Sequence, residues 1–160
     1  PKELAMHAIR LLELFTLDIG SAEQLLELID SEFQALSDRQ LPRLQSILTE
    51  KLPLLTLLDQ HGKERSQLLI SLGLSADRVG LQALAAQSSQ TEELQERGAQ
   101  LNALLERCQA ANLRNGRLIR SSQASANSML SILRGNETPS LYDSRGSAAR
   151  IGQHRPLSQA

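Results

Sequence analysis

The sequence predicts an all-α protein: an elongated antiparallel bundle, close to a coiled-coil rod, of long helices with a short connecting helix and a flexible C-terminal tail. Apolar residues recur every three or four positions over residues 3–134, and no stretch alternates with the period of a β-strand. Aromatic residues make up only 2% of the 160 residues, whereas leucine, alanine and glutamine are abundant, as in helical bundles. Residues 90–134 contain no proline, and one helix of that length would span ~65 Å, too long for a compact globule.

The first predicted helix covers residues 3–36. Its apolar side chains follow each other at spacings of three or four: Leu4, Ala8, Leu11, Phe15, Ile19, Ala22, Leu26, Ile29, Phe33 and Leu36. Ser21 and Gln24 follow Gly20 with the spacing of a capping box, which could open a second helix. Because the phase of the apolar stripe does not change across Gly20, we expect one helix, bent there if at all.

The second predicted helix covers residues 41–72 and follows a turn at 37–42. Pro42 falls in its first turn, where the missing N–H of proline costs no hydrogen bond. Pro53 lies inside it, and an interior proline removes one hydrogen bond and commonly kinks a helix. The leucine density on both sides of Pro53 favours a helix that continues through it and ends at Gly73.

Two further helices and a tail complete the chain. We expect a short helix at 75–86, with Ser75 as its N-terminal cap, and the long helix at 90–134. Short turns between helices favour antiparallel neighbours. Residues 135–160 are rich in glycine, serine, proline and arginine without an apolar period, so they are expected to be mostly disordered. The chain is thus predicted to form one helical domain, residues 1–134, followed by a tail.

Composition argues against several classes of function. The net charge of −1 gives no general case for binding nucleic acid or a membrane surface. The single cysteine, Cys108, excludes an internal disulfide and fits a reducing compartment. No run of uncharged apolar residues is long enough to cross a bilayer as a helix, so no membrane span is expected.

No catalytic or metal-binding motif is evident. His7, His61 and His154 are far apart and lack the spacing of metal ligands, so they are expected to be exposed or near helix caps. Cys108 falls on the apolar stripe of the long helix without a nearby histidine or lysine, which favours a small core residue over a nucleophile. The glycines form no phosphate-binding motif. We therefore predict a protein that is not an enzyme and requires no metal or other cofactor.

The long helix changes character half-way along. One heptad column contains Leu94, Leu101, Cys108, Asn115, Ser122 and Met129. Asn115 places an amide in this seam, a feature that fixes the register of packed helices at some cost in stability. The stripe then holds only small residues over 121–128, and residues 129–133 form a dense apolar patch. This patch is either part of the bundle core or an exposed partner site.

Charge is unevenly distributed as well. Residues 107–134 contain five arginines and no acidic residue, whereas residues 1–50 contain nine acidic and four basic residues. Either these surfaces face each other or the solvent, or the arginines orient an acidic ligand or the C-terminal end of a ligand helix. The basic stretch has no aromatic side chain that could stack on bases, which argues against single-stranded nucleic acid.

Three segments resemble the FlgN family of flagellar type III export chaperones. They are ILTEKLPLLTLLDQHGKER (47–65), NLRNGRLIR (112–120) and SLYDSRGS (140–147), which are similar to the family's middle-helix, long-helix and tail motifs. Pro53 departs from the family's pattern of strong helix formers, which affects the expected straightness of that helix. The resemblance implies a cytoplasmic protein without enzymatic activity.

The resemblance also implies the partners. Such chaperones bind the C-terminal helical segment of the hook–filament junction proteins (hook-associated proteins one and three), prevent their premature self-association and deliver them to the export gate at the membrane. No nucleic acid or small-molecule substrate is implied, and the membrane is involved only through the export apparatus. The alternative is a structural coiled-coil adaptor or a homodimerising helical protein, which would bury the 129–133 patch against itself.

By analogy with the family, the expected client surface is the C-terminal half of the long helix. Its candidate residues are Leu118, Ile119, Met129, Leu130, Ile132 and Leu133. Asn112, Asn115 and Gly116 match the family segment and either take part in binding or only set the helix register. Tyr142 matches the tail tyrosine with which the family docks on the cytoplasmic domain of the export gate.

Overall fold

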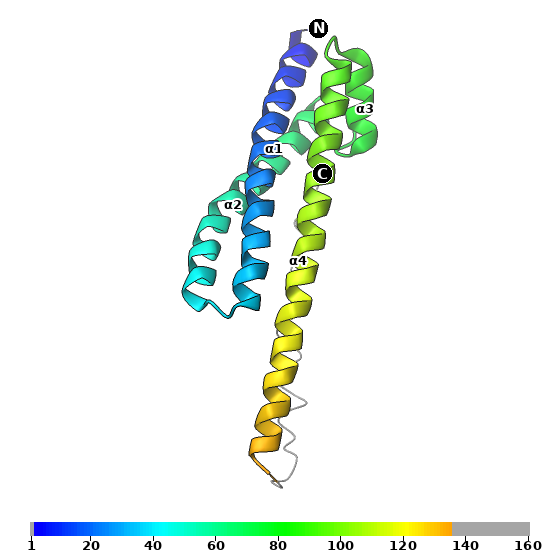
Figure 1. Cartoon of the computed structure of the whole chain (residues 1–160). Coiled ribbons are helices and arrows are strands. Elements are labelled where there is room, and N and C mark those ends of the chain that lie inside the picture. The colour runs from blue at the N-terminus through cyan, green and yellow to red at the C-terminus, as the bar shows by residue number, and fades with distance from the viewer. Residues whose placement is uncertain (1, 136–160) are drawn as a thin grey trace.

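The computed structural model describes residues 2–135, which form four helices and no strand (Figure 1). These helices are α1 (Lys2–Ser37), α2 (Leu41–Ser71), α3 (Arg78–Gln87) and α4 (Thr91–Leu133). For the described residues, the predicted all-α class and the elongated arrangement of long helices with a short connecting helix are confirmed. The predicted tail, apart from Gly135, lies outside the described residues.

Helix α1 is the centre of the bundle. Both α2 and α4 pack against it, whereas the backbones of α2 and α4 do not come close to each other. α2 runs antiparallel to α1, so that His7 faces Ser71 at one end and Glu32 faces Lys51 at the other. α4 runs in the same direction as α1, so the predicted antiparallel arrangement holds for α1 and α2 but is wrong for α1 and α4, because α2 brings the chain back to the end where α1 begins before α4 starts. α3 packs mainly on α4 at that end (Figure 1).

The helix ends follow the glycine and proline signals of the sequence. α1 is continuous through Gly20, and Ser21 lies inside the helix instead of capping a second one. Pro42 occupies the first turn of α2, and α2 continues through Pro53. Gly73 follows α2 with φ of +76°, a left-handed conformation that glycine adopts without a steric penalty.

Helix α3 begins later than predicted, with Asp77 as its cap in place of Ser75. The Asp77 carboxylate accepts a hydrogen bond from the Gly80 N–H (3.0 Å) and another from the Ser75 hydroxyl (2.6 Å). Both bonds lower the pKa of the Asp77 carboxyl, and the bond from Ser75 has the larger effect. Gly80 is needed here, because a Cβ at this position would lie 1.7 Å from the Ser75 carbonyl oxygen. Ser75 therefore supports the cap but does not form it.

The core is thin and extends along α1 in two apolar clusters. The cluster near the start of α1 draws on all four helices and includes Leu11, Phe15, Leu69, Leu84 and Leu101. The cluster nearer the end of α1 joins Leu25 and Ile29 to Cys108 and Ala111 of α4, with partly buried leucines of α2 packed against it. Both clusters consist mainly of aliphatic side chains, as expected for a leucine-rich sequence with few aromatic residues.

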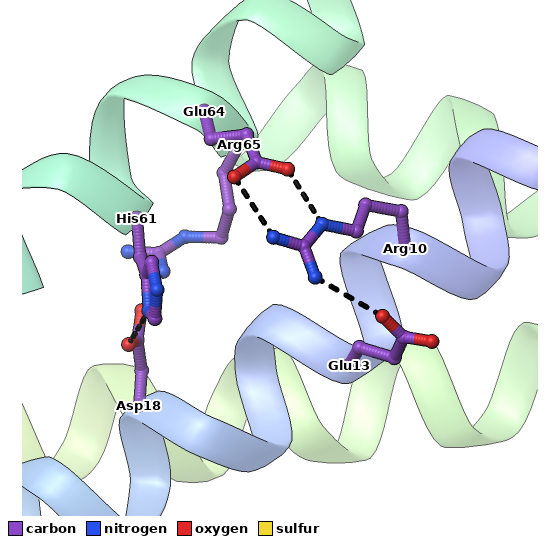
Figure 2. Close-up of polar contacts among 6 residues, drawn as sticks. All are labelled: Arg10, Glu13, Asp18, His61, Glu64 and Arg65. Carbon is purple, nitrogen blue, oxygen red and sulfur yellow. Dashed lines mark hydrogen bonds and ion pairs between the residues drawn. The ribbon is translucent and has the colours of Figure 1, made fainter.

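A buried carboxylate joins α1 to α2 near the middle of α1. Asp18 is fully buried and forms ion pairs with Arg65 and His61 of α2 (Figure 2). The distance from His61 Nδ1 to Asp18 Oδ1 is 2.6 Å, and the Arg65 guanidinium also lies over the Phe15 ring, 5.6 Å from its centroid. These partners offset the cost of placing a carboxylate in the interior.

A more exposed group lies next to this cluster (Figure 2). Arg10 donates hydrogen bonds to both carboxylate oxygens of Glu64, at 2.6 and 3.0 Å, and one to Glu13 at 3.1 Å. The hydrogen bond from Arg10 lowers the pKa of the Glu64 carboxyl. Exposed ion pairs contribute little to stability, so we expect the Asp18 cluster to matter more.

The prediction that His61 is exposed or near a helix cap is wrong. Its side chain is largely buried against Asp18, 43 residues earlier in the chain. Position 61 meets position 18 only because α2 folds back antiparallel on α1, and the periodicity of neither helix shows that pairing. His7 lies near the start of α1, where it bonds to Ser71, and His154 lies outside the described residues.

We predict that Asp18→Ala lowers the free energy of unfolding by about 3–5 kcal/mol, because it leaves the buried Arg65 guanidinium without a counter-ion. Urea titration followed by circular dichroism measures the loss. The matched control is Asp59→Ala, which removes an exposed carboxylate paired with Lys63 at 3.2 Å and should cost about 1 kcal/mol or less. Equal losses for the two variants would contradict the assigned role of Asp18.

Candidate functional site

The seam between α1 and α4 has a constant register. The Cys108 Sγ donates to the carbonyl oxygen of Ala22 (3.6 Å), and the Asn115 Nδ2 donates to that of Ile29 (2.9 Å). Both contacts join residues 86 positions apart, and they lie one heptad from each other. Such a repeat arises when two parallel helices pack along one stripe.

The predicted heptad column is buried along α1 and exposed beyond it. Leu94, Leu101, Cys108 and Asn115 are at most 2% exposed, whereas Met129 is 65% exposed. α1 ends at Ser37, and every residue of α4 from position 121 onward is exposed. We call residues 121–133 the overhang; Figure 1 shows it projecting past the hairpin of α1 and α2.

The structure separates the predicted client residues into two groups. Leu118 and Ile119 are half-buried, close to the end of α1. The other four lie on the overhang and are exposed: Met129 (65%), Leu130 (48%), Ile132 (77%) and Leu133 (77%). The 129–133 patch is therefore exposed and is not part of the bundle core. Tyr142 lies outside the described residues.

Asn115 connects three helices at the inner end of this region. Its amide Nδ2 donates to the Ile29 carbonyl and to Glu32 Oε1 (2.8 Å) of α1, and the other Glu32 oxygen accepts from Lys51 of α2 (3.1 Å). Lys51 is buried as well. The sequence pattern indicates Asn115 but not Glu32 or Lys51. The only signal for these two is a charged residue next to an apolar stripe, which is too common to identify a pair.

The arginines of α4 have different environments. Arg114 donates to Asp30 (3.0 Å) and lies over the Phe33 ring, 4.3 Å from its centroid. Arg117 and Arg120 are exposed and form no ion pair with any residue that the structure describes. Complementary charge within the bundle thus accounts for Arg114 and leaves the other two facing solvent.

Comparison with known proteins identifies the family. The family model described as FlgN protein matches residues 6–150. The chain belongs to the FlgN family. A crystal structure described as a flagella synthesis protein, FlgN, from Pseudomonas aeruginosa is 51% identical, with a TM-score of 0.67, over 78% of this chain and 95% of that one. No curated protein matches the chain.

As a member of the FlgN family, the chain is a flagellar export chaperone. The segment that resembles the family's long-helix motif, residues 112–120, lies on α4. Of the three positions that match the family segment, Asn115 and Gly116 are buried and Asn112 is half-buried. They lie on α4 where its contact with α1 approaches the end of α1. Their burial favours a role in helix register, and the exposed apolar residues follow on the C-terminal side.

Two other features of this FlgN-family protein bear on a functional site: the buried Cys108 and a cavity near α3. Burial raises the pKa of the Cys108 thiol to about 11, so that its thiolate is disfavoured, as suits a core residue. A cavity of about 420 Å³ lies between the helices near α3, with Leu11, Phe15, Leu69 and Leu81 among its apolar lining and Arg65 and Gln95 among its polar lining. Four elements form it, so no single stretch of sequence could reveal it.

Two searches of the described residues bear on other classes of site. Over positions 2–135, no group of three or more histidine, cysteine or acidic side chains has an arrangement that could hold a metal ion. None of the helices in this range combines the length and the apolar character needed to cross a membrane.

We predict that Asn115→Ala lowers the free energy of unfolding by about 1–3 kcal/mol, because it removes the hydrogen bonds of this buried amide with the Ile29 carbonyl, Glu32 and Arg114. Asn112→Ala is the control, because Asn112 forms no hydrogen bond with the side chains that the structure describes; it should cost about 1 kcal/mol or less. Thermal and urea unfolding of both variants measure the difference. A loss at Asn115 no larger than that at Asn112 would refute a register role for this amide.

Proposed function

We propose that this protein is a cytoplasmic chaperone that binds the C-terminal helical segment of hook–filament junction proteins (hook-associated proteins one and three) on the overhang of α4. In this proposal it prevents their premature self-association and delivers them to the type III export gate. The observation that carries the proposal is the exposure of Met129, Leu130, Ile132 and Leu133 on a helix that continues beyond its partner.

The physical basis is the cost of leaving an apolar helix face in water. Burying one large aliphatic side chain contributes about 1.5–3 kcal/mol. A client segment that would otherwise pair with its own kind can place its apolar face on the overhang, as an amphipathic helix does in a groove. Leu118 and Ile119, half-buried at the inner end, would extend this surface toward the body of the bundle.

A second function uses the same surface. A structural adaptor or homodimer would cover the overhang with a second copy of itself, because an exposed apolar patch does not specify its partner. Analytical ultracentrifugation over a wide concentration range distinguishes the two. A monomer at high concentration rules out the homodimer, whereas a stable dimer with the overhang buried would favour it.

We predict that a peptide from the C-terminal helix of a hook-associated protein slows amide hydrogen exchange over residues 121–133. In the free protein, every residue of this stretch is exposed, so it should open locally at little cost. Exchange mass spectrometry or amide NMR shifts of residues 112–134 measure the effect, and the amides of residues 94–108 are the internal control. A saturating peptide that changes neither the amides of 112–134 nor the thermal midpoint would contradict the proposal.

Delivery is proposed to use Tyr142, which matches the tail tyrosine of the family motif SLYDSRGS. We predict that Tyr142→Ala abolishes binding to the cytoplasmic domain of the export gate and leaves client affinity unchanged. Tyr142→Phe, which keeps the ring, is the matched control for an aromatic contact. Calorimetric titration of each variant with gate domain and client peptide checks this, and wild-type gate affinity in Tyr142→Ala would contradict it.

A further inference from the structure

We propose that the client helix binds one face of the overhang, the continuation of the α1 side of α4, and that the part of the client that touches this face carries no charged residue. In this position the client continues the path of α1 along α4. The inference rests on the proposed function and specifies the face and the chemistry of its partner.

The first step is the register of the seam. The buried residues of α4 repeat in heptads: Leu94, Leu101, Cys108 and Asn115 in one column, with Leu104, Leu105, Ala111 and Gly116 beside it. The same spacing continued into the overhang gives Ser122, Ser125, Ala126, Met129, Ile132 and Leu133. Met129, Ile132 and Leu133 therefore lie on the extension of the α1 seam. Leu130 follows the buried Gly116 by two heptads and lies at the edge of the same face.

The second step is the end of α1. With an offset of 86 residues, Ser37 at the end of α1 lies beside position 123 of α4. The chain then turns back into α2, whose backbone does not come close to that of α4. Among the described residues, nothing covers the seam positions beyond this point, and all of them are exposed. A helix laid there would continue an interface that already exists along the body of the bundle (Figure 1).

The third step is the chemistry of the open face. Residues 121–133 contain no charged side chain. Ser122, Ser125 and Ala126 are small and allow a partner backbone to come close, and Met129, Ile132 and Leu133 then supply apolar area. A charge on the client helix would be buried against this face without a counter-ion, which is costly. The contacting face of the client is therefore apolar or neutral and hydrogen-bonding.

The unpaired arginines do not change this conclusion. In the same heptad count, Leu118 and Ile119 continue the seam, so Arg117 and Arg120 both fall on the opposite side of α4. Both are exposed. An acidic residue on the client could reach them only from outside the proposed contact face. The expectation that the arginines orient an acidic ligand is thus not supported for this site.

The experiment measures binding of a peptide from the C-terminal helix of hook-associated protein one or three of the same bacterium to the full chain by calorimetry. Ser125→Glu places a charge on the proposed face and should weaken binding at least tenfold. Ala124→Glu is the matched control: it places the same charge on the neighbouring residue, off the face, and should change affinity less than twofold. Met129→Ser removes the large apolar side chain in the central column of the face and should also weaken binding.

Ser125→Lys tests the neutral character of the client face. If that face is uncharged, Ser125→Lys weakens binding as Ser125→Glu does, and tighter binding would overturn this part of the proposal. Circular dichroism and the thermal midpoint should stay unchanged in all variants, because the substituted residues are exposed and lie beyond the end of α1.

Three other outcomes would overturn the inference. If wild type binds and the paired variants lose affinity equally, the face is wrong while the proposed function stands. If wild type does not bind the peptide, the proposed function and the inference both fail. A wild-type dimer that Ser125→Glu dissociates and the peptide does not displace would assign the face to a second copy of the chain.

Discussion

The parallel seam between α1 and α4 is the constraint on which the rest of the structure depends. Because two contacts one heptad apart hold the same 86-residue offset, the position of every residue of α4 relative to α1 follows from them. α1 reaches its end at Ser37 while α4 continues to Leu133. The overhang is thus set by two helix lengths and one register, and it needs no local sequence signal of its own.

Polar residues in the interior specify how the helices around α1 are placed. Asp18 accepts from two residues of α2, and Asn115 links α4 to Glu32, which in turn binds Lys51 of α2. A narrow core of leucines would tolerate a shift of one helix turn at modest cost, since many apolar pairings resemble each other. Hydrogen-bonded polar groups do not tolerate it, because a shift would leave them buried and unpaired. α1 is therefore held in one register against each neighbour.

The sequence allows the helices to be predicted because their stripes are long and their ends are marked. Gly73 ends α2 and Pro42 occupies its first turn, as their chemistry suggests. The predicted start of α3 is wrong because Ser75 and Asp77, two residues apart, are both suitable caps. The side-chain pairings between helices could not be predicted from the sequence in this way. The contacts of His61 with Asp18 and of Lys51 with Glu32 depend on how α2 crosses α1, which no single periodicity contains. For the overhang, composition indicates an apolar patch, but its exposure follows from where α1 ends.

The contacts of α1 with α2 join residues that are closer in sequence than those joined by its contacts with α4. This difference matters during synthesis. Glu32 and Lys51 are 19 residues apart, whereas Ala22 and Cys108 are 86 apart. Shorter loops cost less entropy to close, and the N-terminal part of a chain leaves the ribosome first. We expect α1 and α2 to pair as a hairpin while the side of α1 that carries Ala22 and Ile29 still faces water. Until α4 has been made, the growing chain displays on α1 the same kind of uncovered helix face that α4 retains at its far end.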